Sequence, residues 1–149
     1  MTPRRTIMLL AAGLLAGAAG LRETELATPK PSLEAPRRIV ASLSESDPER
    51  ANAVLSNLIN VQAFYGQDFV EILLVAYGPG LRHLLRADSS VAERIRSLQA
   101  YGLTFVACGA TLDTLGLTPD AVLEGVEVVQ NGLPEIVERQ LSGWVHIRP

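Results

Sequence analysis

The sequence predicts a three-layer α/β/α domain in which a parallel sheet of about five strands lies between helices, a common sheet size. Two observations predict this class. Short apolar runs rich in β-branched residues alternate along the chain with segments of helical periodicity. The segments between the apolar runs are long enough for crossover connections, which parallel neighbouring strands require.

The first strand and the first helix of this domain follow a proline-containing segment. Residues 38–43, RIVASL, form a short run that predicts a strand. Ser46 then stands three residues before Glu49, which is the spacing of a capping box. Apolar residues recur at helical spacing after it, so we expect an amphipathic helix over residues 47–65.

The second strand and the second helix follow the same order. Residues 69–77, FVEILLVAY, form an almost continuous apolar run, as in a strand that is covered on both faces. A turn at residues 78–80 leads into a short helical piece. Ser90 and Glu93 form a second capping-box pattern before a helix that we expect to end at Gly102 in a left-handed conformation.

Three further strands complete the predicted sheet. Residues 103–108, LTFVAC, predict the third strand, and a short helix near residues 110–115 follows it. Residues 126–129, VEVV, predict the fourth strand. A helix over residues 131–143 then begins at an Asn-Gly pair and is ended by glycine, and residues 144–147, WVHI, predict the fifth strand.

The first 20 residues are typical of an export signal. A basic head with Arg4 and Arg5 precedes an apolar run at residues 7–19, which is shorter than the roughly 20 residues that span a membrane. We expect cleavage, no membrane attachment afterwards and a periplasmic or otherwise exported location; an uncleaved anchor is the alternative. The paired arginines also leave a twin-arginine signal open.

The segment that follows the signal differs in composition from the domain. Residues 21–36 are rich in proline and acidic residues, which predicts a flexible linker, and we place the domain at residues 37–149. Without the two arginines of the signal, 11 of the 13 bases remain against 16 acids, a net charge of −5. No basic run is present, so nucleic acid is not an expected partner.

Several candidate site residues follow the predicted strands. Ligands of parallel α/β sheets bind at the carboxyl ends of the strands. Cys108 ends the third strand, Tyr77 and Gly78 end the second, and Asn131 follows the fourth. Asn131 and the glycine after it either bind an anion through backbone N–H groups or form an ordinary strand-to-helix turn.

Cys108 is the only cysteine of the chain, so it has no partner for an internal disulfide. Because Gly109 and a short helix follow it, backbone N–H groups over Gly109 to Thr111 are expected to stabilise its thiolate. The alternative is a small buried hydrophobic residue at the end of a strand. We also consider whether His83 faces Cys108; the simpler interpretation places His83 and Arg82 on a solvated helix.

No cofactor and no metal are expected. Two histidines and one cysteine, far apart in the sequence, do not have the spacing of a zinc site. The glycines at residues 78–80 also lack the further residues of a dinucleotide-binding or phosphate-binding loop.

Four segments of the domain form a recognisable set: VAYGPGLRHLL at residues 75–85, ACGATL at residues 107–112, GVEVV at residues 125–129 and GWVHIRP at residues 143–149. Together they resemble the DsrE/DsrF-like family of small sulfur-relay proteins. The resemblance covers about residues 38–149. It implies a five-stranded parallel sheet, homo-oligomers such as trimers or hexamers, and a cysteine after the third strand that accepts and passes on a persulfide.

Cys108 falls at the position of that family cysteine. The first hypothesis is therefore an exported carrier of sulfane sulfur or a thiol-redox protein, sulfurtransferase-like, that works with a sulfur-donor or thiol partner protein. The second is a non-catalytic oligomeric module that binds a ligand or a protein and in which the cysteine is structural. The sequence departs from the family pattern at Tyr77, where this branch often has histidine, and Cys108 has no resolving thiol beside it.

Overall fold

A computed structural model describes residues 20–149. The chain divides into two compact units, residues 1–30 and residues 31–149. All of the predicted export signal except Gly20 lies outside the described residues. The described part of the first unit, residues 20–30, contains no helix or strand, and the regular structure lies in the second unit.

Five strands and four α-helices make up the second unit, together with three short 3₁₀ helices labelled η. The elements follow one another in the order β1 (Arg37–Leu43), α1 (Pro48–Tyr65), η1 (Gln67–Phe69), β2 (Val70–Ala76), η2 (Gly78–Leu84), α2 (Ala92–Ala100), β3 (Thr104–Cys108), α3 (Gly109–Thr114), η3 (Pro119–Ala121), β4 (Glu127–Val129), α4 (Gly132–Leu141) and β5 (Val145–Ile147).

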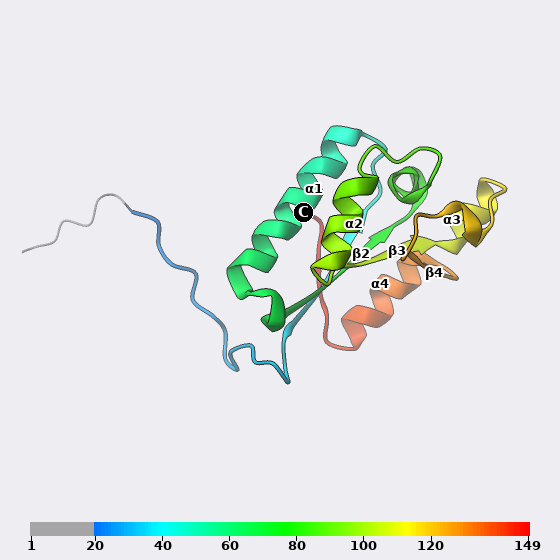
Figure 1. The fold of residues 1–149 in the computed structure, drawn as a ribbon. Coiled ribbons are helices and arrows are strands. Elements are labelled where there is room, and N and C mark those ends of the chain that lie inside the picture. Colours follow the sequence, from blue (N-terminus) through cyan, green and yellow to red (C-terminus); the bar gives the residue numbers. More distant parts are fainter. Residues whose placement is uncertain (1–19) are drawn as a thin grey trace, which may run out of the picture. The chain divides into compact units, whose positions relative to one another are not determined.

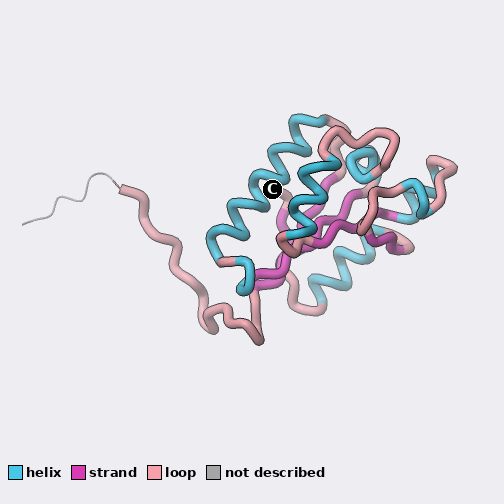
Figure 2. Tube along the Cα trace, viewed as in Figure 1, coloured by secondary structure: helices cyan, strands magenta, loops and turns pink. Residues whose placement is uncertain are grey.

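The five strands form one sheet in the order β4-β3-β2-β1-β5, and every neighbouring pair is parallel. Helices α1 and α2 cover one face of the sheet and α4 covers the other (Figure 1). Figure 2 shows the strands as a continuous central layer between the helices. The predicted three-layer α/β/α fold with a five-stranded parallel sheet is confirmed.

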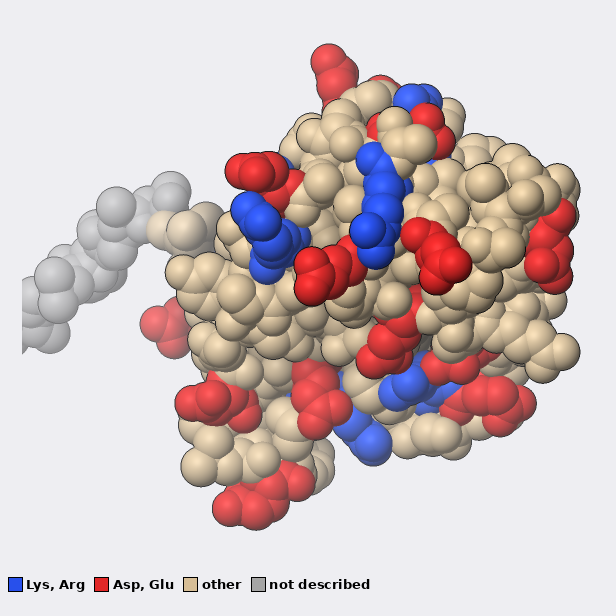
Figure 3. All heavy atoms as spheres, turned by 45° about the vertical axis from the view of Figure 1, so that its right-hand side comes forward, with Lys and Arg blue, Asp and Glu red and all other residues tan. Residues whose placement is uncertain are grey.

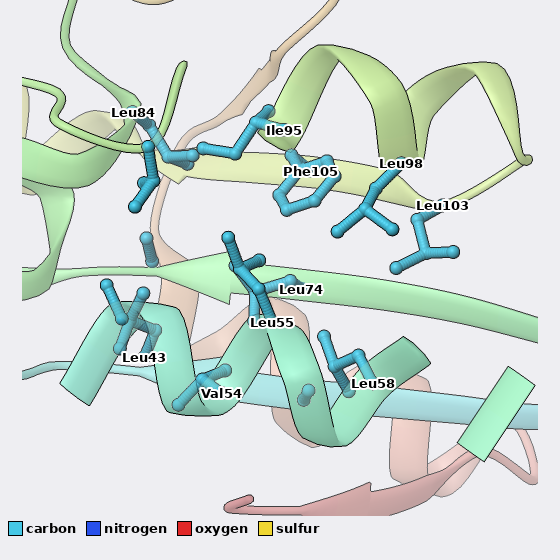
Figure 4. Packing of buried hydrophobic residues seen from close by; sticks show 14 of the residues in the cluster. Leu43, Val54, Leu55, Leu58, Leu74, Leu84, Ile95, Leu98, Leu103 and Phe105 are labelled. Atoms are coloured by element: carbon cyan, nitrogen blue, oxygen red, sulfur yellow. The ribbon is translucent and has the colours of Figure 1, made fainter. Parts of the chain in front are cut away.

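The two faces of the sheet are packed very unequally. On the first face, alternate residues of β1, β2 and β3 pack against α1, α2 and η2, with Phe105 and Leu74 fully buried between the layers (Figure 4). On the second face, Ile136 of α4 is the buried residue that packs against the remaining strand positions. Those positions are Val40, Leu73, Val75 and Val106. The second face therefore depends on a single helix.

Both predicted capping boxes are wrong, because neither Ser46 nor Ser90 is the residue that caps its helix. Helix α1 starts at Pro48, so the residue that caps it is Asp47, whose carboxylate accepts the N–H of Glu49 at 3.2 Å. Helix α2 is capped by Val91 without a side-chain hydrogen bond. The hydroxyl of Ser89, not Ser90, accepts the N–H of Val91 at 3.3 Å.

The end of α4 and the strand that follows it are held by polar side chains. The guanidinium of Arg139 stacks over the ring of Trp144 at 4.9 Å, and that of Arg38 from β1 lies 5.8 Å from the same ring. His146 of β5 hydrogen-bonds the hydroxyl of Ser42 at 3.0 Å. These contacts attach the last strand and helix to β1.

The described residues show neither the helix pattern of a membrane span nor the side-chain pattern of a metal site, and the face drawn in Figure 3 shows no basic nucleic-acid surface. Within residues 20–149, no helix has the length and hydropathy to cross a membrane, and no cluster of three or more His, Cys, Asp or Glu residues has a metal-binding arrangement. On the face drawn in Figure 3, basic and acidic side chains are interspersed. No continuous basic field is visible on that face.

Candidate functional site

Cys108 is the last residue of β3 and the N-cap of α3. Its side chain is 3% exposed. It lies in the wall of a pocket of about 320 Å³, which is lined by Tyr77, Gly78, Cys108, Ala110, Thr111, Thr114, Asn131 and Leu133. No charged side chain lines this pocket, so the groups that act on the sulfur are hydroxyl, amide and backbone groups.

Two helices begin next to the sulfur of Cys108. The backbone N–H of Gly132, the first residue of α4, points to the sulfur at 3.2 Å. The N–H groups of Thr111 and Ala110, in the first turn of α3, also lower the pKa of the thiol, Ala110 with the smaller effect because its N–H donates to the carbonyl oxygen of Gln130 at 3.0 Å. The N-terminus of a helix carries partial positive charge and unpaired N–H groups, so both helices favour a negative charge on the sulfur.

The hydroxyl of Thr111 adds a side-chain donor to this set. Its oxygen accepts the backbone N–H of Gly78 at 3.0 Å. Since one lone pair is occupied in this way, the hydroxyl hydrogen is free to point to the sulfur of Cys108, and this hydroxyl lowers the pKa of the thiol. The loop after β2 therefore orients a donor that stands on α3.

The pKa of Cys108 reflects these contacts. Burial of the sulfur raises the pKa, whereas hydrogen bonds from the Thr111 hydroxyl and from the N–H groups of Gly132, Thr111 and Ala110 lower it. The net result is a pKa below the ordinary value of a cysteine. The structure thus favours the thiolate, which is the nucleophilic form of the side chain.

Two glycines make the close approach of the backbone possible. A Cβ on Gly132 would lie 3.0 Å from Val75 Cγ1 and 3.2 Å from the Cβ of Cys108. A Cβ on Gly109 would lie 2.6 Å from the carbonyl oxygen of Val129. Any larger residue at either position would push α4 or α3 away from the end of β3.

The topology explains why this pocket lies between β3 and β4. After β3 the chain forms α3, whose Leu112 packs in the core of the first face. After β4 the chain forms α4, which packs on the second face. Neighbouring strands whose connections leave to opposite faces form a crevice at their carboxyl ends. Cys108 pairs with Val129 at the end of this strand pair.

Most of the residues predicted from strand ends come together here. Tyr77, Gly78, Thr111 and Asn131 line the same pocket as Cys108, and the amide oxygen of Asn131 lies 3.9 Å from the sulfur. Gly109 does not line this pocket. It packs against the backbone of β4 and contributes to a neighbouring hollow of about 210 Å³.

The hypothesis that His83 faces Cys108 is wrong. His83 is 1% exposed, and its Nε2 hydrogen-bonds the carbonyl oxygen of Glu45 at 2.9 Å. The residues after β2 form a 3₁₀ helix, which turns His83 into the interior beneath the loop after β1. The alternative of a solvated histidine is wrong too, although Arg82 beside it is exposed.

Thr114 and Leu133 line the pocket and were not predicted. Ala110 lies within the stretch from Gly109 to Thr111 whose backbone was expected to stabilise the thiolate, and Gly132 was considered as an anion-binding donor but was not placed beside Cys108. Ala110 and Thr114 lie on the same short helix as Thr111. The predicted helix near residues 110–115 could therefore have indicated that they lie close to Cys108. The donor role of Gly132 depends on β4 lying next to β3, which the sequence does not specify. An Asn-Gly pair at the start of a helix is the available signal for an approaching backbone N–H.

A comparison with protein families identifies one family for most of the chain. The sequence profile of the DsrE/DsrF-like family matches residues 36–149. A protein of unknown function from Methanobacterium thermoautotrophicum, MTH1491, is similar in structure with a TM-score of 0.72 and 39% sequence identity. The similarity covers 76% of this chain and 99% of that one.

Two other solved structures are similar in fold alone. The ychN protein from E. coli has a TM-score of 0.60 at 17% identity, over 76% of this chain and 97% of that one. The conserved protein of unknown function BT1422 from Bacteroides thetaiotaomicron has a TM-score of 0.60 at 16% identity, over 75% and 94% of the two chains. A comparison with curated proteins finds no match.

Proposed function

The chain belongs to the DsrE/DsrF-like family, which is associated with sulfur relay, and on this premise we propose that it carries sulfane sulfur as a persulfide on Cys108. The family supports the class of chemistry. The pocket at the end of β3 supports the choice of residue, because the Thr111 hydroxyl and three backbone N–H groups lower the pKa of one thiol there.

The proposed loading reaction is a nucleophilic displacement at sulfur. The Cys108 thiolate attacks the outer sulfur of a donor persulfide, R–S–SH. A bond forms between the cysteine sulfur and that outer sulfur, the S–S bond of the donor breaks, and the donor leaves as the thiolate R–S⁻ with the electron pair. Unloading repeats this exchange with an acceptor thiolate, so no external oxidant or reductant is required.

The surroundings of Cys108 fit both steps of this exchange. The N–H of Gly132 and the Thr111 hydroxyl stabilise the thiolate before the attack and again when it leaves the persulfide. The pocket of about 320 Å³ beside the sulfur provides room for one more sulfur atom and the end of a donor. Because no charged residue lines the pocket, we expect small neutral or polar donors.

The observation that carries this proposal is the 3.2 Å contact between the Gly132 N–H and the Cys108 sulfur, at the junction of two helix starts. The test is incubation of the purified protein with the persulfide of 2-mercaptoethanol, a small neutral donor, followed by a thiol-tag shift assay and intact mass measurement. We expect a gain of one sulfur atom that dithiothreitol removes, and none in Cys108→Ser. Failure to load Cys108 from any persulfide donor would remove the proposal.

A structural role for Cys108 is the second candidate, and the 3% exposure of its side chain favours it. In that case the protein is a ligand-binding or protein-binding module with an inert thiol. Alkylation by iodoacetamide distinguishes the two. A carrier reacts in the native state with a rate that follows the thiolate fraction, whereas an inert thiol reacts only after denaturation.

The setting of this reaction is also part of the proposal. The export signal predicted at residues 1–20 supports a periplasmic or otherwise exported protein. Because the chain has one cysteine, a second molecule has to complete the exchange, and we propose a sulfur-donor or thiol partner protein for this role. The family resemblance supports a homo-oligomer, and light scattering on the purified protein measures the subunit number.

A further inference from the structure

A second hollow lies on the outer helical layer, away from Cys108. It has a volume of about 640 Å³ and is lined by Ile59, Gln62, Ala63, Gly66, Gln67, Glu93, Arg94, Arg96, Ser97, Leu98 and Tyr101. No residue is shared with the pocket of Cys108. We call this hollow the α1–α2 groove. Its volume falls within the range of small-molecule sites, roughly 300–1,000 Å³.

Polar contacts hold α1 and α2 together at both ends of the groove. At one end, Arg94 of α2 donates to the carbonyl and side-chain oxygens of Asn52 at 3.1 and 2.6 Å, and to the Ser56 hydroxyl at 3.1 Å. At the other end, Gln62 of α1 donates to the carbonyl oxygen of Tyr101 at 2.9 Å. The helices are therefore bridged at their ends and leave a hollow between the bridges.

The interior of the groove is apolar. Leu98 is buried and contributes to its wall, Ala63 is a small neighbour, and the larger side chains of Ile59 and Tyr101 are 39% and 59% exposed. Exposed isoleucine and tyrosine side chains beside one hollow offer contact area to an apolar body.

Arg94 gives the groove a positive charge that no carboxylate of the described residues balances. Arg96 is neutralised by Glu93 at 3.4 Å, but within residues 20–149 no carboxylate lies at ion-pair distance from Arg94. All three acceptors of Arg94 are neutral oxygens. A half-buried guanidinium held in place by neutral groups keeps its full charge for a ligand.

The hydrogen bonds of Arg94 also leave one edge of its guanidinium available. They use the two terminal nitrogens, and within the described part of the chain Nε–H has no partner. Arginine offers five N–H donors, and the edge formed by Nε and a terminal nitrogen matches the two oxygens of a carboxylate.

From this geometry we propose that the α1–α2 groove binds a small organic carboxylate with an apolar body, with the carboxylate on Arg94 and the apolar body against Leu98, Ile59 and Tyr101. The inference is independent of the chemistry of Cys108, because the two sites share no residue. The ligand class follows from an unneutralised guanidinium at one end of an apolar hollow.

The test uses octanoate as the probe and nuclear magnetic resonance of the ¹⁵N-labelled chain as the measurement. We expect octanoate to shift the amide signals of Ala63, Leu98 and Tyr101 in a saturable manner. Acetate, which lacks the apolar body, and octanol, which lacks the charge, are each expected to bind about tenfold more weakly. Equal binding of acetate or octanol, or no shift with octanoate, overturns the proposal.

Two substitutions test the role of Arg94. Arg94→Gln removes the charge, and Ser97→Asp introduces a carboxylate into the groove while leaving the contacts of Arg94 with α1 intact. Each is expected to weaken octanoate binding about tenfold. Arg82→Gln, a charge-matched control outside the groove, and Cys108→Ser are expected to bind within about twofold of the unmodified chain. Unchanged binding in Ser97→Asp overturns the proposal even if Arg94→Gln unfolds.

Discussion

The hydroxyl oxygen of Thr111 lies 3.0 Å from the backbone nitrogen of Gly78 and accepts its hydrogen. The same hydroxyl lowers the pKa of the Cys108 thiol. The loop after β2 and the helix after β3 thus share one side chain, and the orientation of the hydroxyl is fixed by backbone rather than by solvent. Thr111, which takes no part in the attack itself, therefore helps to set the pKa of the thiol.

Replacing Thr111 with valine tests this control. The substitution keeps the shape of the side chain and removes the donor, so the pKa of Cys108 rises. At neutral pH the alkylation rate is expected to fall about threefold to tenfold, the equivalent of one lost hydrogen bond. Thr111→Ser keeps the hydroxyl and serves as control. Equal rates in all three proteins would show that Thr111 does not act on the sulfur.

The sequence predicted the strands and helices because their signals are local. β2 is an almost continuous apolar run, and Gly102 has the predicted positive φ of 94° at the end of α2. The caps were misplaced because Ser46 and Asp47 are both good capping residues, and the choice depends on where Pro48 starts the helix.

The candidate site was predictable only in part. Tyr77, Gly78, Asn131 and Cys108 follow strands that end at one edge, so their proximity follows from any parallel sheet with these neighbours. The burial of His83 was not predictable, because it depends on the rotation of a 3₁₀ turn that no periodic pattern specifies. The donor role of Gly132 depends on strand order.

Gly132→Ala is expected to weaken both the fold and the site. The added methyl group would meet Val75 and the Cβ of Cys108 and move the start of α4 away from the sulfur. We expect a loss of about 1–3 kcal/mol in the free energy of unfolding and slower alkylation of Cys108. Urea denaturation and iodoacetamide kinetics measure the two effects. Pro134→Ala, at an exposed position in the first turn of α4, is the control. Unchanged stability and reactivity would contradict the close packing described here.

The stability of the protein is expected to depend on the ionisation of Cys108. Its pKa is lower in the folded state than in the unfolded chain, so the stabilising contribution is complete above the unfolded pKa and is lost as pH falls through the folded pKa. The difference in unfolding free energy between the native chain and Cys108→Ser should therefore increase with pH in that window and level off above about pH 9. Urea titrations across this pH range measure the difference in unfolding free energy. A difference that falls with rising pH would show that the pKa of Cys108 is higher in the folded state than in the unfolded chain.

The substitution His83→Leu is expected to lower the stability of the fold without changing the reactivity of Cys108. The substitution leaves the carbonyl oxygen of Glu45 without its buried partner, which is expected to cost about 1–3 kcal/mol of unfolding free energy. The pH dependence of Cys108 alkylation is expected to stay unchanged, because His83 does not line the pocket of Cys108 and its ring is hydrogen-bonded to the Glu45 carbonyl. His83→Gln keeps a polar group at this position and is the control for stability. A shifted alkylation profile in His83→Leu would restore a link between the two residues.

Trp144 gives the second face of the sheet an internal fluorophore. It is the single tryptophan of the chain, and the guanidinium groups of Arg139 on α4 and Arg38 on β1 both lie over its ring. Separation of α4 from the sheet removes one of these cations from the ring, which changes its emission. Because Gly132, at the opposite end of the same helix, donates to the sulfur, the emission of Trp144 offers an optical signal for whether that donor is in place, readable in real time without a label.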